Sequence, residues 1–119
     1  MPKAAISLTT GLEDAEKVTV AFLVAVGAAE SGRETMMFLT KESVRLATDG
    51  FVHAVACDGC PPLTTLLDRY AAAGGTYLVC GICVQSKVLD PAGFLGNAKV
   101  GGTVQLWEWI DEGTATFSF

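Results

Sequence analysis

The 119 residues are the length of one ordinary domain, and 50% of them are apolar, which is enough to form a core without cross-links. The 8 Lys and Arg residues against 13 Asp and Glu residues give a net charge of −5, and no segment concentrates basic side chains. This charge balance argues against nucleic acid as a direct partner.

Apolar runs of strand length alternate with helical segments along the whole chain. Thr10 and Glu13 are spaced as in a capping box and mark the start of the first helix. The predicted strands are residues 4–10, 35–40, 76–80, 98–102 and 114–119. The predicted helices are residues 12–29, 41–48, 63–73 and 103–112, with a short one within 84–97, and residues 51–62 are predicted as an ordered loop.

The hydrophobicity of these strands is continuous rather than alternating, which is typical of strands buried on both faces. Together with the strand and helix order, it predicts a three-layer α/β/α sandwich with a mainly parallel sheet of about five strands. We expect residues 1–119 to form one domain, because no linker, repeat or low-complexity segment divides them.

The longest apolar run, residues 18–29, is too short to cross a bilayer, which takes about 20 residues. It predicts a core helix and no membrane partner. Because this helix is apolar on nearly every face, one small domain cannot easily cover it, and we expect a homo-oligomer. The first residues lack the apolar segment of a secretory signal, so the expected location is the cytosol.

Four cysteines form two pairs, Cys57 with Cys60 and Cys80 with Cys83. In the cytosol thiols stay reduced, so these residues indicate metal binding or reactivity more than structural disulfides. Ligands of a parallel sheet gather at the carboxyl ends of its strands. The helix 63–73 leads away from this edge and the strand 76–80 returns to it, so we expect both pairs at one rim.

Cys80 is predicted to lie where a strand passes into a helix. A thiolate at a helix N-terminus is stabilised by free backbone N–H groups, which lowers its pKa into the reactive range. Gly81 would let the backbone approach a bound group closely, and Lys87 would add positive charge nearby. His53, the one histidine, is a candidate base or ligand, although a single histidine in an apolar loop more often only packs.

The spacing C-x2-C-x19-C-x2-C also fits a tetrahedral zinc site made of all four cysteines. Structural zinc, however, usually replaces a core in small loop-rich modules, and this chain has ample apolar residues. The sequence "CGIC" opens a helix as redox dithiols do, but thioredoxin-like folds place that motif after their first long strand. Buried cysteines that only pack are the remaining alternative.

The chain resembles the DsrE/DsrF-like family of sulfur-relay proteins over nearly its whole length. The most specific motifs are "FLTKESVRLA", residues 38–47, and the cysteine-bearing strand end followed by "QSK", residues 85–87. Family members often have Arg-Gly after the cysteine segment, where this chain has Lys87 and Val88.

The resemblance implies a small α/β sandwich that assembles into trimers or hexamers. It also implies that Cys80 carries sulfane sulfur as a persulfide and passes it between sulfur donor and acceptor proteins, without a metal or organic cofactor. Cys83 could release the sulfur by forming a disulfide with Cys80, or Cys57 and Cys60 could act as acceptor. A four-cysteine zinc or regulatory module and a thiol-disulfide or peroxide-reducing protein acting through Cys80 and Cys83 are the alternative functions.

Overall fold

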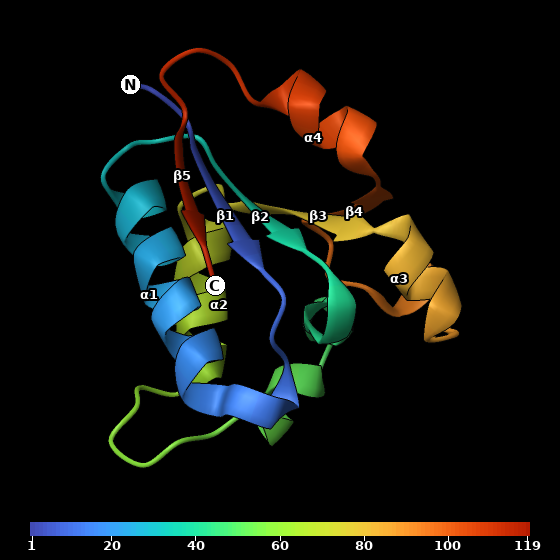
Figure 1. Ribbon diagram of the computed structural model, residues 1–119. Helices are drawn as coiled ribbons and strands as arrows, with labels where there is room; N and C mark the ends of the chain where they lie inside the picture. The colour runs from blue at the N-terminus through green and yellow to red at the C-terminus, as the bar shows by residue number, and fades with distance from the viewer.

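A computed structural model describes residues 1–119 and contains a five-stranded sheet with the order β4-β3-β2-β1-β5 (Figure 1). Every pair of neighbouring strands is parallel, which confirms the predicted α/β fold. The strands are β1 (Ala4–Leu8), β2 (Thr35–Leu39), β3 (Thr76–Cys80), β4 (Ala98–Gly101) and β5 (Ala115–Ser118). The α-helices are α1 (Ala15–Glu30), α2 (Leu63–Ala72), α3 (Gly81–Ser86) and α4 (Thr103–Trp109). The 3-10 helices are η1 (Leu12–Asp14), η2 (Lys41–Ala47), η3 (Phe51–Ala54) and η4 (Pro91–Gly93).

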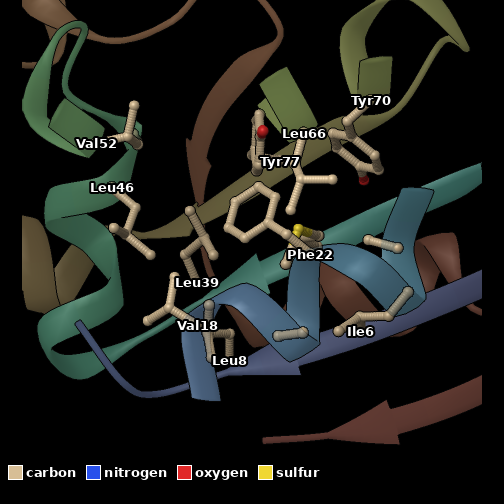
Figure 2. Packing of buried hydrophobic residues seen from close by; sticks show 14 of the residues in the cluster. Ile6, Leu8, Val18, Phe22, Leu39, Leu46, Val52, Leu66, Tyr70 and Tyr77 are labelled. Atoms are coloured by element: carbon tan, nitrogen blue, oxygen red, sulfur yellow. The ribbon is translucent and has the colours of Figure 1, made fainter. Parts of the chain in front are cut away.

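The main core lies between one face of the sheet and the two long helices α1 and α2, which run side by side. Every second strand residue points into it, because side chains alternate across a strand. Burial of each large side chain in this layer contributes about 1.5–3 kcal/mol. Figure 2 shows the sheet residues Ile6, Leu8, Leu39 and Tyr77 facing Val18 and Phe22 of α1 and Leu66 and Tyr70 of α2.

The other face of the sheet has a smaller apolar cluster. Met36, Phe38 and Leu78 are buried there, and Leu106 and Trp109 of α4 pack against them. The two faces of the sheet are therefore both covered by helices, as predicted for a three-layer sandwich, although the second helical layer is much thinner than the first.

The first helix begins later than predicted. Glu13 accepts the backbone N–H of Gly11 at 2.7 Å within η1, so the predicted capping box with Thr10 does not form. Asp14 instead caps α1 by accepting the N–H of Lys17 at 3.0 Å. An aspartate satisfies a free helical N–H as well as threonine does, and here it stands one residue before the α-helix.

Two shorter segments also differ from the prediction. Residues predicted as a helix over 41–48 form the 3-10 helix η2, and the predicted loop 51–62 contains the 3-10 helix η3. In η2 the buried Ser43 accepts a hydrogen bond from the N–H of Thr40 at 2.9 Å, which fixes a tight first turn.

None of the helices combines the length and hydrophobicity needed to span a membrane.

Candidate functional site

Cys80 and Cys83 lie one helical turn apart at the carboxyl end of β3. Cys80 is the last residue of β3 and the N-cap of α3, and Cys83 is in the first turn of that helix. Both are free thiols and both are half-buried. The position of Cys80 at a junction from strand to helix, which the sequence predicted, is confirmed.

The sulfur of Cys83 accepts a hydrogen bond from the backbone N–H of Lys41 at 3.2 Å. Lys41 follows β2, which is the neighbour of β3, so the parallel sheet brings the two segments to the same edge. Its φ of 54° is left-handed, a conformation that residues other than glycine rarely adopt. A backbone amide fixed in this way can hold a sulfur atom that carries negative charge.

The charged side chains beside this contact form a small network around Glu42. Its carboxylate lies 3.4 Å from Nε of Arg45 and 3.5 Å from Nζ of Lys87. Lys87 was predicted to add positive charge near Cys80, but its ammonium group is paired with Glu42. These side chains are partly exposed, so each ion pair contributes little to stability, on the order of 0–1 kcal/mol.

Helix α3 ends in a Schellman motif. The N–H of Val88 donates to the carbonyl of Gln85 at 3.1 Å, and the N–H of Leu89 donates to the carbonyl of Val84 at 3.1 Å. This motif places Val88 at φ 54°, where glycine is the usual residue. Val88 is 89% exposed, so burial of its side chain does not offset the strain.

The second cysteine pair lies elsewhere. Cys57 and Cys60 are joined by a disulfide in the loop before α2, so they are not the two free thiols that the sequence predicted. Figure 1 shows this loop below α1 and α2, on the opposite side of the view from α3. The two pairs do not come together: Sγ of Cys57 lies 3.8 Å from the hydroxyl of Thr19 on α1, whereas Sγ of Cys83 contacts the backbone of Lys41 after β2.

The remaining predicted neighbours are His53, which lies on η3, and Gly81, which directly follows Cys80. His53 is exposed on η3 and lines two cavities of about 290 and 320 Å³, the second of which is also lined by Cys57 and Cys60. Gly81 follows Cys80, but a Cβ there would meet Val100 at 3.4 Å, an ordinary contact, so close packing does not require glycine. No three His, Cys, Asp or Glu side chains of residues 1–119 come close enough to share a metal ion.

Sequence reasoning missed Lys41 as a neighbour of Cys83. The residue lies inside the motif "FLTKESVRLA", which was recognised as specific but was not assigned a place at the site. The signal that points to it is topological: the segments that follow two adjacent parallel strands begin at the same sheet edge.

The parallel sheet, the helices on both faces and the free cysteines at a strand end define a small α/β protein with a thiol site at its sheet edge. The profile of the DsrE/DsrF-like family matches residues 3–119, and the chain belongs to that family. No match to the sequence was found among curated proteins.

Several solved structures share this fold. The ychN protein from E. coli is 16% identical, with a TM-score of 0.80 over 100% of both chains. MTH1491 from Methanobacterium thermoautotrophicum is 10% identical, with a TM-score of 0.75 over 100% of both chains. BT1422 from Bacteroides thetaiotaomicron is 18% identical, with a TM-score of 0.67, and the match covers 98% of this chain and 94% of that one. At these identities the similarity establishes the fold.

Proposed function

We propose that the protein is a sulfur carrier in which Cys80 accepts sulfane sulfur as a persulfide and passes it to the thiol of a partner protein. Membership of the DsrE/DsrF-like family supports a role in sulfur relay. The observation that carries the proposal is the pair of free thiols at the end of β3, one of which faces a fixed backbone N–H.

The transfer needs only thiol chemistry. The thiolate of Cys80 attacks the sulfane sulfur of a donor persulfide, the new S–S bond forms, and the donor leaves as a thiolate. A partner thiolate then attacks the terminal sulfur and releases Cys80 as a thiolate. Alternatively, the thiolate of Cys83 attacks the Cys80 sulfur, which forms a disulfide between them and releases hydrosulfide. The amide of Lys41 is placed to hold the Cys83 thiolate for this second route.

The test is sulfur loading followed by mass spectrometry. The protein is incubated with inorganic polysulfide, and the mass of the intact chain is measured before and after treatment with a reductant. We expect an adduct of about 32 Da per added sulfur, removable by dithiothreitol, on the parent protein and on Cys83→Ser. Cys80→Ser should carry no adduct. Equal loading of Cys80→Ser and the parent would show that another thiol is the carrier.

We also propose that the chain works in the cytosol as a homo-oligomer, a trimer or hexamer. Support comes from large apolar side chains at the surface. Val20 and Leu23 on α1 are 42% and 44% exposed, and Val104 and Trp107 on α4 are 63% and 72% exposed, each pair three residues apart on one helix face. Light scattering of the purified protein measures the assembly mass, and a monomer at micromolar concentration would contradict the proposal.

A further inference from the structure

Cys57 and Cys60 close a disulfide across a single turn, outside the site described above. Their Cα atoms are 5.4 Å apart, and the N–H of Cys60 donates to the carbonyl of Cys57 at 3.2 Å. Gly59 supplies the left-handed residue of the turn, with a φ of 78°. A disulfide that encloses so few residues restricts the unfolded chain far less than one that closes a long loop, so its effect on stability is small.

The loop is held in place by residues on both sides of the disulfide. Val55 and Leu63 belong to the main core and are 6% and 3% exposed. Neither Cys57 nor Cys60 belongs to that core or packs against it as a partly buried residue, whereas Cys80 and Cys83 do. The fold therefore does not depend on this disulfide for its packing.

The disulfide also lies beside an open cavity of about 320 Å³. Cys57, Cys60, Thr19, His53 and Pro61 are among the residues that line it. Both cysteines are half-buried, so a thiol on a small molecule or on an extended peptide can reach the S–S bond from the cavity. A disulfide in a protein of the reducing cytosol, the location proposed above, is usually transient and catalytic or redox-sensing rather than structural.

We propose that the Cys57–Cys60 disulfide is a second reactive site, which oxidises a dithiol substrate docked in this cavity. Thr19 determines which of the two sulfur atoms the substrate attacks. Its hydroxyl donates to the carbonyl of Ala15 at 2.8 Å, so the hydroxyl oxygen presents lone pairs to Sγ of Cys57, 3.8 Å away. An anion on Cys57 would face those lone pairs, whereas a neutral Cys57 thiol can donate to them. The leaving thiolate is therefore on Cys60, and the attacked sulfur is that of Cys57.

The exchange balances without a further reactant. One thiolate of the substrate attacks Sγ of Cys57, the Cys57–Cys60 bond breaks, and Cys60 leaves as a thiolate. The second thiolate of the substrate attacks its own sulfur in the mixed disulfide, which closes the substrate disulfide and releases Cys57. The two protons lost by the substrate thiols reach Cys57 and Cys60 through solvent. The substrate is oxidised by two electrons, and the protein disulfide is reduced by two.

The experiment uses the full chain, folded and oxidised, with dihydrolipoamide as the dithiol probe. Thiols are alkylated with a maleimide and counted by intact mass. We expect the count to rise from the two free thiols, Cys80 and Cys83, to all four cysteines, with one lipoamide formed per chain. The control, which carries both Cys80→Ser and Cys83→Ser, should rise from none to two. A disulfide that is reduced only after denaturation would overturn the proposal.

Single variants test the direction of attack. Each variant also carries Cys80→Ser and Cys83→Ser, so that one thiol remains. With 5,5′-dithiobis(2-nitrobenzoate) as the probe disulfide, that thiol is first converted to a mixed disulfide, and the release of the aryl thiolate by dihydrolipoamide is timed. We expect release from Cys60→Ser, in which Cys57 carries the adduct, to be at least several-fold faster than from Cys57→Ser. The opposite order would overturn the assignment of Cys57. A protein with both Cys57→Ser and Cys60→Ser should still load sulfur on Cys80. The sulfur-carrier proposal and the disulfide proposal can therefore each be contradicted without the other.

Discussion

The rings of Tyr70 and Tyr77 pack against each other with centroids 5.2 Å apart, yet their hydroxyl groups have opposite surroundings (Figure 2). The hydroxyl of Tyr70 donates to the carbonyl of Thr76 at 2.7 Å and lies 3.3 Å from that of Thr35. The hydroxyl of Tyr77 is buried without a partner. Burial raises the pKa of both phenols well above its ordinary value, so both stay neutral.

This difference predicts opposite effects of the same substitution. Tyr70→Phe loses its hydrogen bond and leaves a buried carbonyl short of a donor, which should lower the free energy of unfolding by about 1–2 kcal/mol. Tyr77→Phe removes an unsatisfied polar group from the core and should leave stability unchanged or raise it. Urea denaturation of the three proteins measures both effects. A Tyr77→Phe protein as unstable as Tyr70→Phe would mean that the Tyr77 hydroxyl has a partner.

The backbone of Gly75 passes directly against the ring of Tyr70. A Cβ at this position would lie 2.3 Å from the ring, and the ring is fully buried, so it has no room to move. Gly75→Ala should therefore destabilise the protein by about 1–3 kcal/mol. Gly27 is the matched control, because it lies in α1 with open space around its Cα, and Gly27→Ala should stabilise by about 0.5–1 kcal/mol. Thermal unfolding that ranks the two variants the other way would refute this packing.

The sequence predicts the parts of the fold that local interactions determine, and it predicts less well the parts that depend on residues far apart in the chain. The strands, the long helices and the parallel sheet follow from apolar runs and their order, which are local signals. The start of α1 and the 3-10 geometry of η2 depend on side-chain hydrogen bonds: Asp14 accepts from the N–H of Lys17, and Ser43 accepts from the N–H of Thr40. The choice among competing donors and acceptors at such positions is made by tertiary packing, which a spacing pattern does not contain.

The cysteine site was also predictable only where local sequence order determines it. Cys80 follows its strand directly, so its place at the sheet edge is fixed by local order. Cys57 lies beside α1 and Cys83 beside the segment after β2, and these neighbours depend on where each connecting segment runs along the end of the sheet. Path lengths along a helix and a strand bring both pairs to the same end of the sheet, but they do not say which elements each pair contacts there.

Val88 is strained at the C-terminus of α3, and the strain can be relieved. Val88→Gly should raise the free energy of unfolding by about 0.5–1 kcal/mol, because glycine adopts φ 54° freely and little buried surface is lost. Val104→Gly is the matched control. It lies in α4 and is 63% exposed, so the same change should destabilise by about 0.3–0.5 kcal/mol, the difference in helix propensity between valine and glycine. Chemical denaturation distinguishes them, and a destabilised Val88→Gly would show that the valine side chain has a contact that offsets the strain.

The ion pair between Glu30 of α1 and Arg69 of α2 predicts a pH dependence. Arg69 donates to the Glu30 carboxylate at 2.6 and 3.0 Å, and this hydrogen bond holds the pKa of Glu30 below its ordinary value of 4.5. Because the folded pKa is the lower one, the pair stabilises the fold above pH 4.5 and loses that contribution as pH falls through the folded pKa. Both side chains are exposed, so the effect is small and weakens with salt.

Glu30→Gln measures this contribution. The variant should unfold at a slightly lower temperature than the parent at pH 7, and the two temperatures should converge as the pH falls below 4.5. Arg69→Gln should behave in the same way, and the double variant should add nothing further, since the pair is already broken. A gap between parent and variant that widens in acid would contradict the pairing.

The strand order gives the polypeptide a particular risk during its synthesis. Strand β1 is made early, but one of its two edges is covered only by β5, residues 115–118. Until the ribosome has released those residues, the apolar strand Ala4–Leu8 presents an open row of N–H and C=O groups to any other nascent chain. Slow translation late in the message should therefore promote aggregation more than slow translation early in it.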